Sequence, residues 1–279
     1  MPNIGTPGEL IALRERVAGL ESVVVAFSGG VDSALVLKIA VDALDPIRVL
    51  AATARSPSVP RGELETVAAL AEEIGARHEF VDTHEFDNPD YLANPSNRCY
   101  FCKDELYTHL ARLAERRGFQ TVINGVNADD LGDFRPGLTA ANQHRVAAPL
   151  AECGISKAQV RDIAATLGLS IHDKPASPCL SSRVQYGESI TPEKLRQIDA
   201  AESFLRTLGF RELRVRHHAN LARIEVPLGE VPRFADPELR KLVADRLREI
   251  GYQYVTLDLC GFRSGSMNEV LLGRGLARK

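Results

Sequence analysis

Residues 28–33 read Ser-Gly-Gly-Val-Asp-Ser and combine the groups that bind a phosphate. They lie between an apolar run at 23–27, typical of a buried parallel strand, and an apolar stretch at 34–40 that predicts a helix. The two glycines let the backbone approach a ligand closely, and the helix start directs amide N–H groups to the same place. The Ser33 hydroxyl could join them, and Asp32 suits a divalent cation beside the anion. A glycine-rich turn without a ligand is the alternative.

Three of the five cysteines lie where thiol chemistry would be expected. Cys99 and Cys102 have the two-residue spacing of metal ligands and of redox pairs, and Cys179 lies in the proline-containing segment 174–183. A zinc site would need two further ligands, and a thioredoxin-type pair would need another strand and helix context, so the pair alone is ambiguous. Three thiolates from two loops would also suffice for a [4Fe-4S] cluster with one open iron.

The elements around these residues predict an α/β fold with a doubly wound parallel sheet. Strands are predicted at residues 23–27, which form an apolar run, and at 48–53, 77–82 and 121–124, with a short fifth strand at 146–150. Helical spacing between the first three strands gives a βαβαβ order, in which right-handed crossovers make the strands parallel. Ligands of such sheets bind at the carboxyl ends of the strands.

The carboxyl edge of this sheet is the predicted nucleotide site. Asp129 and Asp130 follow the fourth strand, and carboxylates there suit a Mg²⁺ ion carried by ATP, although a helix cap would explain either one. The residues assigned to the nucleotide are Ser28, Gly29, Gly30, Val31, Asp32, Ser33, Thr53, Asn127 and Asp129. Asp32 and Asp130 are assigned to Mg²⁺.

Residues 1–187 are expected to form the nucleotide-binding domain and residues 188–279 a smaller α+β domain. The second part shows a helix, two strands of alternating polarity that could pair as a hairpin, another helix and a final strand. Arg214 and Arg216 alternate along one face of the first of these strands and would suit a phosphate. A solvated strand face explains them nearly as well.

Composition describes an ordinary globular protein, with 279 residues, 44% of them hydrophobic, and a formal net charge of −3. This charge argues against nucleic acid or an anionic membrane as a partner. No run approaches the roughly 20 apolar residues of a membrane span, and the first residues lack the features of a secretion signal, so a cytoplasmic location is expected. The odd number of cysteines argues against a disulfide framework.

Six stretches resemble those of the LarE family of ATP-dependent sulfur transferases, within the PP-loop ATP pyrophosphatase superfamily. They are SGGVDS from residue 28, NRCYFCK from 97, NGVNADDLGDFRPG from 124, SPCLSSR from 177, YGESIT from 186 and LDLCGFRSGSMNE from 257. The first is specific only to the superfamily, whereas the fourth and sixth are more telling. The resemblance spans nearly the whole chain. It implies an adenine nucleotide alpha hydrolase-like fold, the use of ATP and Mg²⁺, and assembly as a homo-oligomer.

The resemblance further implies a substrate, pyridinium-3,5-biscarboxylic acid mononucleotide, and a role in making a nickel-pincer nucleotide cofactor. A carboxylate would be adenylated and then converted to a thiocarboxylate. Catalysis would depend on Cys179 and Asp32. Arg183 follows Cys179 by four residues and should lie in the same pocket, so it is assigned both to catalysis and, by pairing with a carboxylate or phosphate, to substrate binding. The resemblance also favours substrate contact for Arg214 and Arg216. In one version Cys179 gives up its own sulfur, and in the other it holds a [4Fe-4S] cluster with Cys99 and Cys102. The presence of these two cysteines favours the cluster.

Two other functions stay open at this point. A [4Fe-4S]-dependent tRNA thiolase of the same superfamily would also use a Cys-x-x-Cys pair and a third cysteine, but the sequence has no zinc-ribbon module and no strongly basic face. A nucleotide-binding regulator or metallochaperone would bind ATP or metal without turnover.

Overall fold

The computed structural model describes residues 7–132, 135–175 and 177–263, and the chain divides into two compact units. Unit 1 comprises Met1–Asn88 and Asn97–Ser177, and unit 2 comprises Pro89–Ser96 and Pro178–Lys279. Part of the stretch beginning at residue 257, from residue 264 onward, lies outside the described residues, as do Asp133 and Phe134 of the stretch beginning at 124.

The division differs from the boundary expected after residue 187. The chain passes into unit 2 at Pro178, and residues 89–96 also belong to unit 2. Asn94 gives the physical reason, because it is fully buried and its side-chain amide donates hydrogen bonds to three backbone carbonyls of unit 2. Those carbonyls belong to Val184, Gln185 and Glu188.

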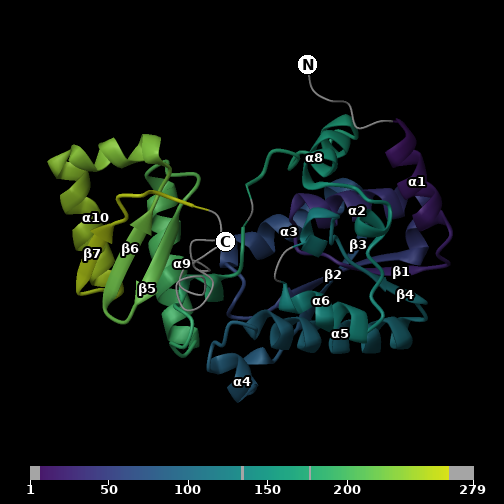
Figure 1. Cartoon of the computed structure of the whole chain (residues 1–279), viewed down its shortest axis with the longest axis horizontal. Coiled ribbons are helices and arrows are strands. Elements are labelled where there is room, and N and C mark those ends of the chain that lie inside the picture. Colours follow the sequence, from purple (N-terminus) through teal and green to yellow (C-terminus); the bar gives the residue numbers. More distant parts are fainter. Residues whose placement is uncertain (1–6, 133–134, 176, 264–279) are drawn as a thin grey trace, which may run out of the picture. The chain divides into compact units, whose positions relative to one another are not determined.

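Unit 1 contains a sheet of four parallel strands in the order β3-β2-β1-β4, which confirms the predicted fold class (Figure 1). The strands are β1 (Val23–Ala26), β2 (Val49–Arg55), β3 (Arg77–Asp82) and β4 (Thr121–Ile123). In register, Val23 of β1 lies opposite Val49 on one side and Thr121 on the other. The chain runs outward from β1 to β3 and then returns to the other side of β1, so the strand order reverses between β1 and β4. Open α/β sheets bind ligands at such a point.

Helices cover both faces of this sheet (Figure 1). The helices of unit 1 are α1 (Pro7–Ala18), α2 (Val31–Ala43), α3 (Arg61–Ile74), α5 (Arg98–Arg117), α6 (Pro136–Gln143), α7 (Pro149–Glu152) and α8 (Lys157–Thr166). Residues of α1, α2, α3 and α8 share one apolar core, and residues of α5 and α6 share the other. Alternate residues of β1 enter different cores, Val23 and Val25 the first and Val24 the second, as the two-residue period of a strand requires.

The expected fifth strand at 146–150 is wrong. Only Ala147 pairs, through a single parallel bridge to Ile123, and Pro149 then begins α7. Proline has no backbone N–H and its fixed φ suits the first turn of a helix, so it ends the pairing.

Unit 2 contains α4 (Pro89–Leu92), α9 (Pro192–Thr207), α10 (Pro237–Ile250), β5 (Arg214–His218), β6 (Leu221–Glu225) and β7 (Tyr254–Leu257). The sheet order is β5-β6-β7, with β5 and β6 paired antiparallel as the expected hairpin and β7 parallel to β6. The side chain of Thr191 caps α9 by accepting a hydrogen bond from the Lys194 amide. One apolar core joins this sheet to α9 and α10. None of the helices within the described residues is long and apolar enough to cross a membrane.

Candidate active site

The loop from residue 28 to residue 33, which we call the PP-loop, joins β1 to α2 at the carboxyl edge of the sheet. Gly29 has a φ of +70°, and a Cβ atom there would lie 2.3 Å from Cγ2 of Val67 in α3. Only glycine meets both conditions without strain. Gly30 is the N-cap of α2 and gives its first amides no side-chain acceptor. The loop is therefore a backbone cradle at a helix N-terminus, which suits an anion.

Two serines hold the PP-loop closed. The buried hydroxyl of Ser33 donates to the Gly30 carbonyl over 3.0 Å and accepts from the Ser28 amide over 3.2 Å. A hydroxyl has one proton, so in the 3.1 Å contact between the two hydroxyl oxygens Ser28 must be the donor. Ser33 thus shapes the loop, while Ser28 is the more exposed of the two.

Asp32 connects the PP-loop to the segment that follows β4. Its Oδ1 accepts a hydrogen bond of 3.0 Å from the side-chain amide of Asn127, and its Oδ2 is paired with the ammonium group of Lys157 at the start of α8. A Cβ at Gly125 would lie 2.6 Å from the Ser33 amide nitrogen, so the two loops meet backbone to backbone. The structure brings Asp32 and Asn127 together, as the sequence predicts.

The two aspartates after β4 have different surroundings. Asp130 is 9% exposed. It accepts a hydrogen bond of 3.1 Å from the backbone amide of Asn127 and pairs with Arg135 at 2.7 Å. Asp129 accepts a 2.9 Å hydrogen bond from the Lys157 amide at the first turn of α8. Asp32 and Asp130 each use both oxygens in contacts within the protein, but the Asp32 side chain is 22% exposed and that of Asp130 is 12% exposed, so Asp32 is the more accessible carboxylate for Mg²⁺.

Thr53 lies at the same edge, but its hydroxyl faces the protein. It is 4% exposed and donates to the carbonyl of Phe27 over 2.7 Å, directly before the PP-loop. The same oxygen lies 2.8 Å from Nε2 of His78, which must then carry the proton. Burial lowers the pKa of His78, so the ring is neutral near pH 7. Thr53 therefore holds the strand end that leads into the PP-loop.

Lys157 is the residue that the sequence analysis missed. A cation in the first turn of a helix is opposed by the helix dipole, so a lysine there needs another reason. The capping box formed by Ser156 and Gln159 marks the helix start unambiguously. This unfavourable position was the available signal, and the partner that explains it is Asp32.

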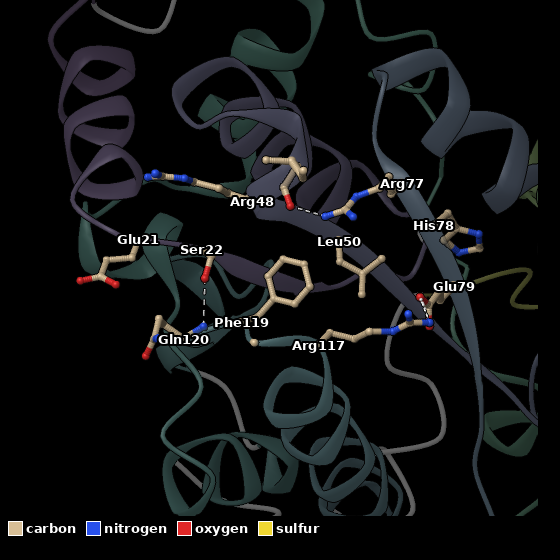
Figure 2. A pocket seen from close by; sticks show the side chains of 12 residues that line it. Glu21, Ser22, Arg48, Leu50, Arg77, His78, Glu79, Arg117, Phe119 and Gln120 are labelled. Atoms are coloured by element: carbon tan, nitrogen blue, oxygen red, sulfur yellow. Dashed lines mark hydrogen bonds and ion pairs between the residues drawn. The ribbon is translucent and has the colours of Figure 1, made fainter.

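A hollow of about 1020 Å³ in unit 1 lies at the opposite edge of the sheet, where the strands begin (Figure 2). Charged side chains surround the ring of Phe119 in Figure 2. Two of these charged side chains already have partners within the hollow. The Arg77 guanidinium lies 5.8 Å from the centre of the Phe119 ring, and Arg117 pairs with Glu79 at 2.7 Å. This hollow is separate from the PP-loop.

Cys99 and Cys102 lie in the first turns of α5, within a helix rather than ahead of one. Their three-residue separation places both on one side of the helix, where two thiolates could share one metal ion. Across residues 7–132, 135–175 and 177–263, no three His, Cys, Asp or Glu side chains gather as a metal site. The third predicted ligand, Cys179, belongs to unit 2. The donor set suits a cluster in its chemistry, and the shared site stays a prediction.

Cys179 is half-buried and begins a 3₁₀ turn, Leu180–Arg183. Arg183 is fully buried, and its Nε and Nη2 donate to the two carboxylate oxygens of Glu202 over 2.8 and 3.0 Å. Its Nη1 donates to the Pro178 and Cys179 carbonyls over 2.6 and 3.1 Å. The expectation that Arg183 binds substrate finds no support in this placement, because each nitrogen is engaged inside the unit and none of the side chain is exposed.

Arg214 and Arg216 lie on one face of β5, and both are buried rather than solvated. Arg216 pairs with Glu225 and donates to the Ser182 carbonyl over 2.9 Å. Burial, followed by the charge of Arg183, lowers the pKa of Arg214 to about 10. The structure therefore places several guanidinium groups close together in unit 2, each of a type that binds phosphate or carboxylate oxygens.

The residues of unit 1 fit ATP and Mg²⁺. The cradle that a Cβ at Gly29 would fill, the amides at the start of α2 and the carboxylate of Asp32 supply an anion site and a hard oxygen ligand side by side.

The chain resembles one known protein family over part of its length and several known proteins over most of it. The NAD synthase family model matches residues 11–90. The chain is 51% identical to an uncharacterized protein of Synechocystis, over 93% of this chain and 96% of the relative. It is 39% identical to pyridinium-3,5-bisthiocarboxylic acid mononucleotide synthase of Lactiplantibacillus plantarum, over 92% of this chain and 93% of that protein. An uncharacterized protein of Methanocaldococcus jannaschii is 27% identical over 88% of this chain and 92% of its own length.

The match to the synthase extends beyond the nucleotide-binding part, since 92% of this chain takes part and both units are included. The NAD synthase model, in contrast, is confined to residues of unit 1 and the first residues of unit 2. A shared PP-loop alone would not produce an alignment of this length. The chain belongs to the LarE family, the family of pyridinium-3,5-bisthiocarboxylic acid mononucleotide synthase.

Proposed function

We propose that this chain is an ATP-dependent sulfur transferase of nickel-pincer cofactor synthesis. It adenylates a carboxylate of pyridinium-3,5-biscarboxylic acid mononucleotide, releasing pyrophosphate, and then converts that group to a thiocarboxylate, releasing AMP. The observation that carries the proposal is the 39% identity, over 92% of the chain, to a synthase whose name states a bisthiocarboxylic product. The backbone cradle of the PP-loop supports it, because adenylation requires a site for pyrophosphate.

The first step makes the carboxylate reactive. A carboxylate is a poor electrophile, and its attachment to AMP supplies a good leaving group. A carboxylate oxygen attacks the α-phosphorus of ATP, and the bond to the bridging oxygen breaks with its electron pair going to pyrophosphate. We assign the stabilisation of that developing charge to the amides at the start of α2 and to the ammonium group of Lys157, which lies beside Asp32.

Mg²⁺, when bound, would neutralise part of the phosphate charge and orient the pyrophosphate. Asp32 is the residue that we assign to hold it. Asn127 orients the Asp32 carboxylate from the side of β4, and Asp129 ties that loop to α8. Asp130 keeps the loop in shape through its contacts with the Asn127 amide and Arg135.

The second step delivers sulfur to the activated carbonyl carbon, and the bond to AMP breaks. We assign the sulfur-bearing role to Cys179. In one version the Cys179 thiolate attacks the carbonyl carbon and AMP leaves. The Cα proton of Cys179 is then removed by a base and the Cβ–S bond breaks, which releases the thiocarboxylate and leaves dehydroalanine. In the other, Cys179 holds a [4Fe-4S] cluster with Cys99 and Cys102, which would supply a sulfide. We favour the cluster version because both additional cysteines are present on one side of α5.

Arg214 and Arg216 are the residues of unit 2 that we assign to the anionic groups of the substrate. Both lie on one face of β5, in the unit that contains Cys179, and guanidinium groups form paired hydrogen bonds with phosphate and carboxylate oxygens. Arg216 is already paired with Glu225, so an anion would join this existing network. Both are 5–7% exposed, so an anion that reaches them is largely removed from water and its interactions are strengthened.

The experiment that tests the proposal measures AMP and pyrophosphate formed from ATP and Mg²⁺, with the pyridinium dicarboxylate mononucleotide and with bulk tRNA in parallel. We expect stimulation by the mononucleotide and the appearance of a thiocarboxylate. Stimulation by tRNA alone would point to a tRNA thiolase, and ATP binding without either product would point to a regulator. Both results would reject the proposed substrate.

The two sulfur sources are separated by a second experiment. Anaerobically reconstituted protein is expected to contain about four iron atoms per chain, as a [4Fe-4S] cluster requires. Cys99→Ala and Cys102→Ala should each abolish this iron, whereas Cys153→Ala is the matched control and should retain it. If both variants still perform one full turnover and Cys179 loses the mass of one sulfur and two hydrogen atoms, as conversion to dehydroalanine requires, the sacrificial version is correct.

A further inference from the structure

We propose that Arg183 and Glu202 form a buried clamp that positions Cys179, and that neither residue touches the substrate. The inference rests on the sulfur-bearing role assigned to Cys179 above. It replaces the expected substrate contact of Arg183 with a positioning role and adds Glu202, which no sequence motif singled out.

The clamp begins at the backbone of the cysteine. The Cys179 carbonyl accepts three hydrogen bonds, from the Ser182 amide over 3.0 Å, the Ser182 hydroxyl over 2.8 Å and Nη1 of Arg183 over 3.1 Å. The same Nη1 donates to the Pro178 carbonyl over 2.6 Å. One guanidinium group thus binds the carbonyls of two successive residues. The Cα atom of Cys179 lies between these two carbonyls, so the same contacts fix the point from which its side chain extends.

Glu202 holds the other side of the guanidinium group. Its two oxygens accept from Nε and Nη2 of Arg183 in the paired geometry that a planar guanidinium favours. Both side chains are 0% exposed. Such a pair is held firmly because a loose partner would leave an unpaired charge away from water.

The clamp is anchored to the most regular part of unit 2. Glu202 lies in α9, its Oε1 also accepts the Val215 amide of β5 over 3.0 Å, and its Oε2 pairs with Arg206 one helical turn later. A helix and a strand therefore fix Glu202, Glu202 fixes Arg183, and Arg183 fixes the cysteine loop. A substrate would have to break these bonds to reach either side chain, which argues against direct contact.

The test uses two full-length variants, since a single charge removal could unfold the unit. Arg183→Lys keeps the charge but cannot bridge Glu202 and two carbonyls together. The double variant Arg183→Met, Glu202→Gln leaves no uncompensated buried charge and keeps an acceptor for the Val215 amide. Glu230→Gln is the matched control, because Glu230 forms a half-exposed pair with Arg233 in the same unit.

The first readout is the rate at which iodoacetamide alkylates Cys179 in cluster-free protein, with Cys260 of the same chain as the internal standard. We expect a rise of tenfold or more for Cys179 in both variants, no change for Cys260, and no change in the control. Equal alkylation of Cys179 in the wild type and in folded variants would overturn the proposal. This readout needs no enzymatic activity, so failure of the proposed function would be seen separately.

The second readout compares the two chemical steps. We expect thiocarboxylate formation to fall at least tenfold while the KM for ATP in pyrophosphate release stays within twofold of the wild type. A large rise in KM for the pyridinium mononucleotide with kcat unchanged would instead identify Arg183 as a substrate-binding residue and overturn the proposal. Thermal unfolding curves recorded on the same samples establish that the variants are folded.

Discussion

Asp32 lies where two distant segments of unit 1 meet, because its partners follow it by 95 positions in Asn127 and by 125 positions in Lys157. The ammonium group of Lys157 supplies the opposite charge, and the amide of Asn127 sets the orientation. These two contacts fix the position of the Asp32 carboxylate even when no cation is bound.

Replacing Asp32 by asparagine tests this role. The asparagine side chain would keep the shape and an oxygen for the Asn127 amide, so the fold should be retained, but the negative charge for Mg²⁺ is lost. We expect pyrophosphate release to fall by about 100-fold or more, since metal-based charge stabilisation is worth several kcal/mol. The matched control is Asp42→Asn, on the same helix and paired with Lys38 at the surface, which should keep the wild-type rate. A normal rate in Asp32→Asn would remove Asp32 from the mechanism.

At the scale of single residues, the sequence did not reveal which side chains pair with partners that lie far away in the chain. The PP-loop is a continuous run of six residues, so its chemistry can be interpreted without a structure. Lys157 and Glu202 acquire their roles only from partners elsewhere, Asp32 and Arg183, and nothing local specifies those partners. Arg183 illustrates the same limit, because its four-residue distance from Cys179 suggested a substrate contact, and its burial depends on a helix that packs on it later in the chain.

The junction of β1, the PP-loop and α2 is the element on which the nucleotide site depends. The loop passes so close to α3 that the Gly29 position has no room for a side chain, and the Gly125 position after β4 has none beside α2. The PP-loop therefore packs tightly against the Val67 side chain, and the loop after β4 packs against the backbone of Asp32 and Ser33, which restricts the movement of both loops. Rigid donors aimed at a ligand need no reorganisation when it binds.

Substitution of Gly29 by alanine tests this close packing. A positive φ costs an alanine roughly 1–2 kcal/mol, and the contact with Val67 adds to that cost. We expect a loss of at least about 1 kcal/mol in unfolding free energy, together with a marked loss of ATP binding measured by calorimetry. Gly62→Ala, in α3, is the control, because nothing lies within 4 Å of its added Cβ. Unchanged stability and ATP affinity in Gly29→Ala would show that the cradle is less tight than described.

At the level of helices and strands, regular sequence patterns were sufficient to predict the elements, whereas irregular segments could not be predicted. β1 and most of β2 come from apolar runs, and glycines follow α3 and α5 in left-handed conformations, so the helix ends are clear. The run at 146–150 also looked apolar, but its proline turned the chain into α7. Residues 89–96 carried no signal for unit 2, because the contacts of Asn94 are with backbone carbonyls, which every residue possesses.

The whole molecule joins two units with separate cores and separate chemistry, an anion cradle in one and a cysteine loop with buried arginines in the other. The stability of the second unit should depend on pH through Glu202. Burial raises the pKa of Glu202, but the charge and hydrogen bonds of Arg183, the Val215 amide and Arg206 outweigh it, so the pKa lies below its ordinary value. Glu202 therefore stabilises the folded unit at neutral pH.

This stabilisation has a definite pH dependence. A carboxyl group with a lowered folded pKa contributes fully above its unfolded value, about 4.3, and the contribution is lost as pH falls through the lower folded value. We expect Glu202→Gln to lower the melting temperature most near pH 7, and the difference from the wild type to shrink below about pH 4. Thermal unfolding followed by circular dichroism between neutral and acid pH measures this. A difference that is independent of pH would contradict the lowered pKa.

The central claim is that one chain activates a carboxylate with ATP and then supplies the sulfur. The most direct measurement is a single turnover of the full chain with ATP, Mg²⁺ and the pyridinium dicarboxylate mononucleotide, in which pyrophosphate, AMP and thiocarboxylate are quantified together for the wild type, Cys179→Ser and Cys153→Ser. The account predicts equal amounts of the three products for the wild type and Cys153→Ser, and pyrophosphate without thiocarboxylate for Cys179→Ser. Thiocarboxylate formed by Cys179→Ser at the wild-type rate would contradict it.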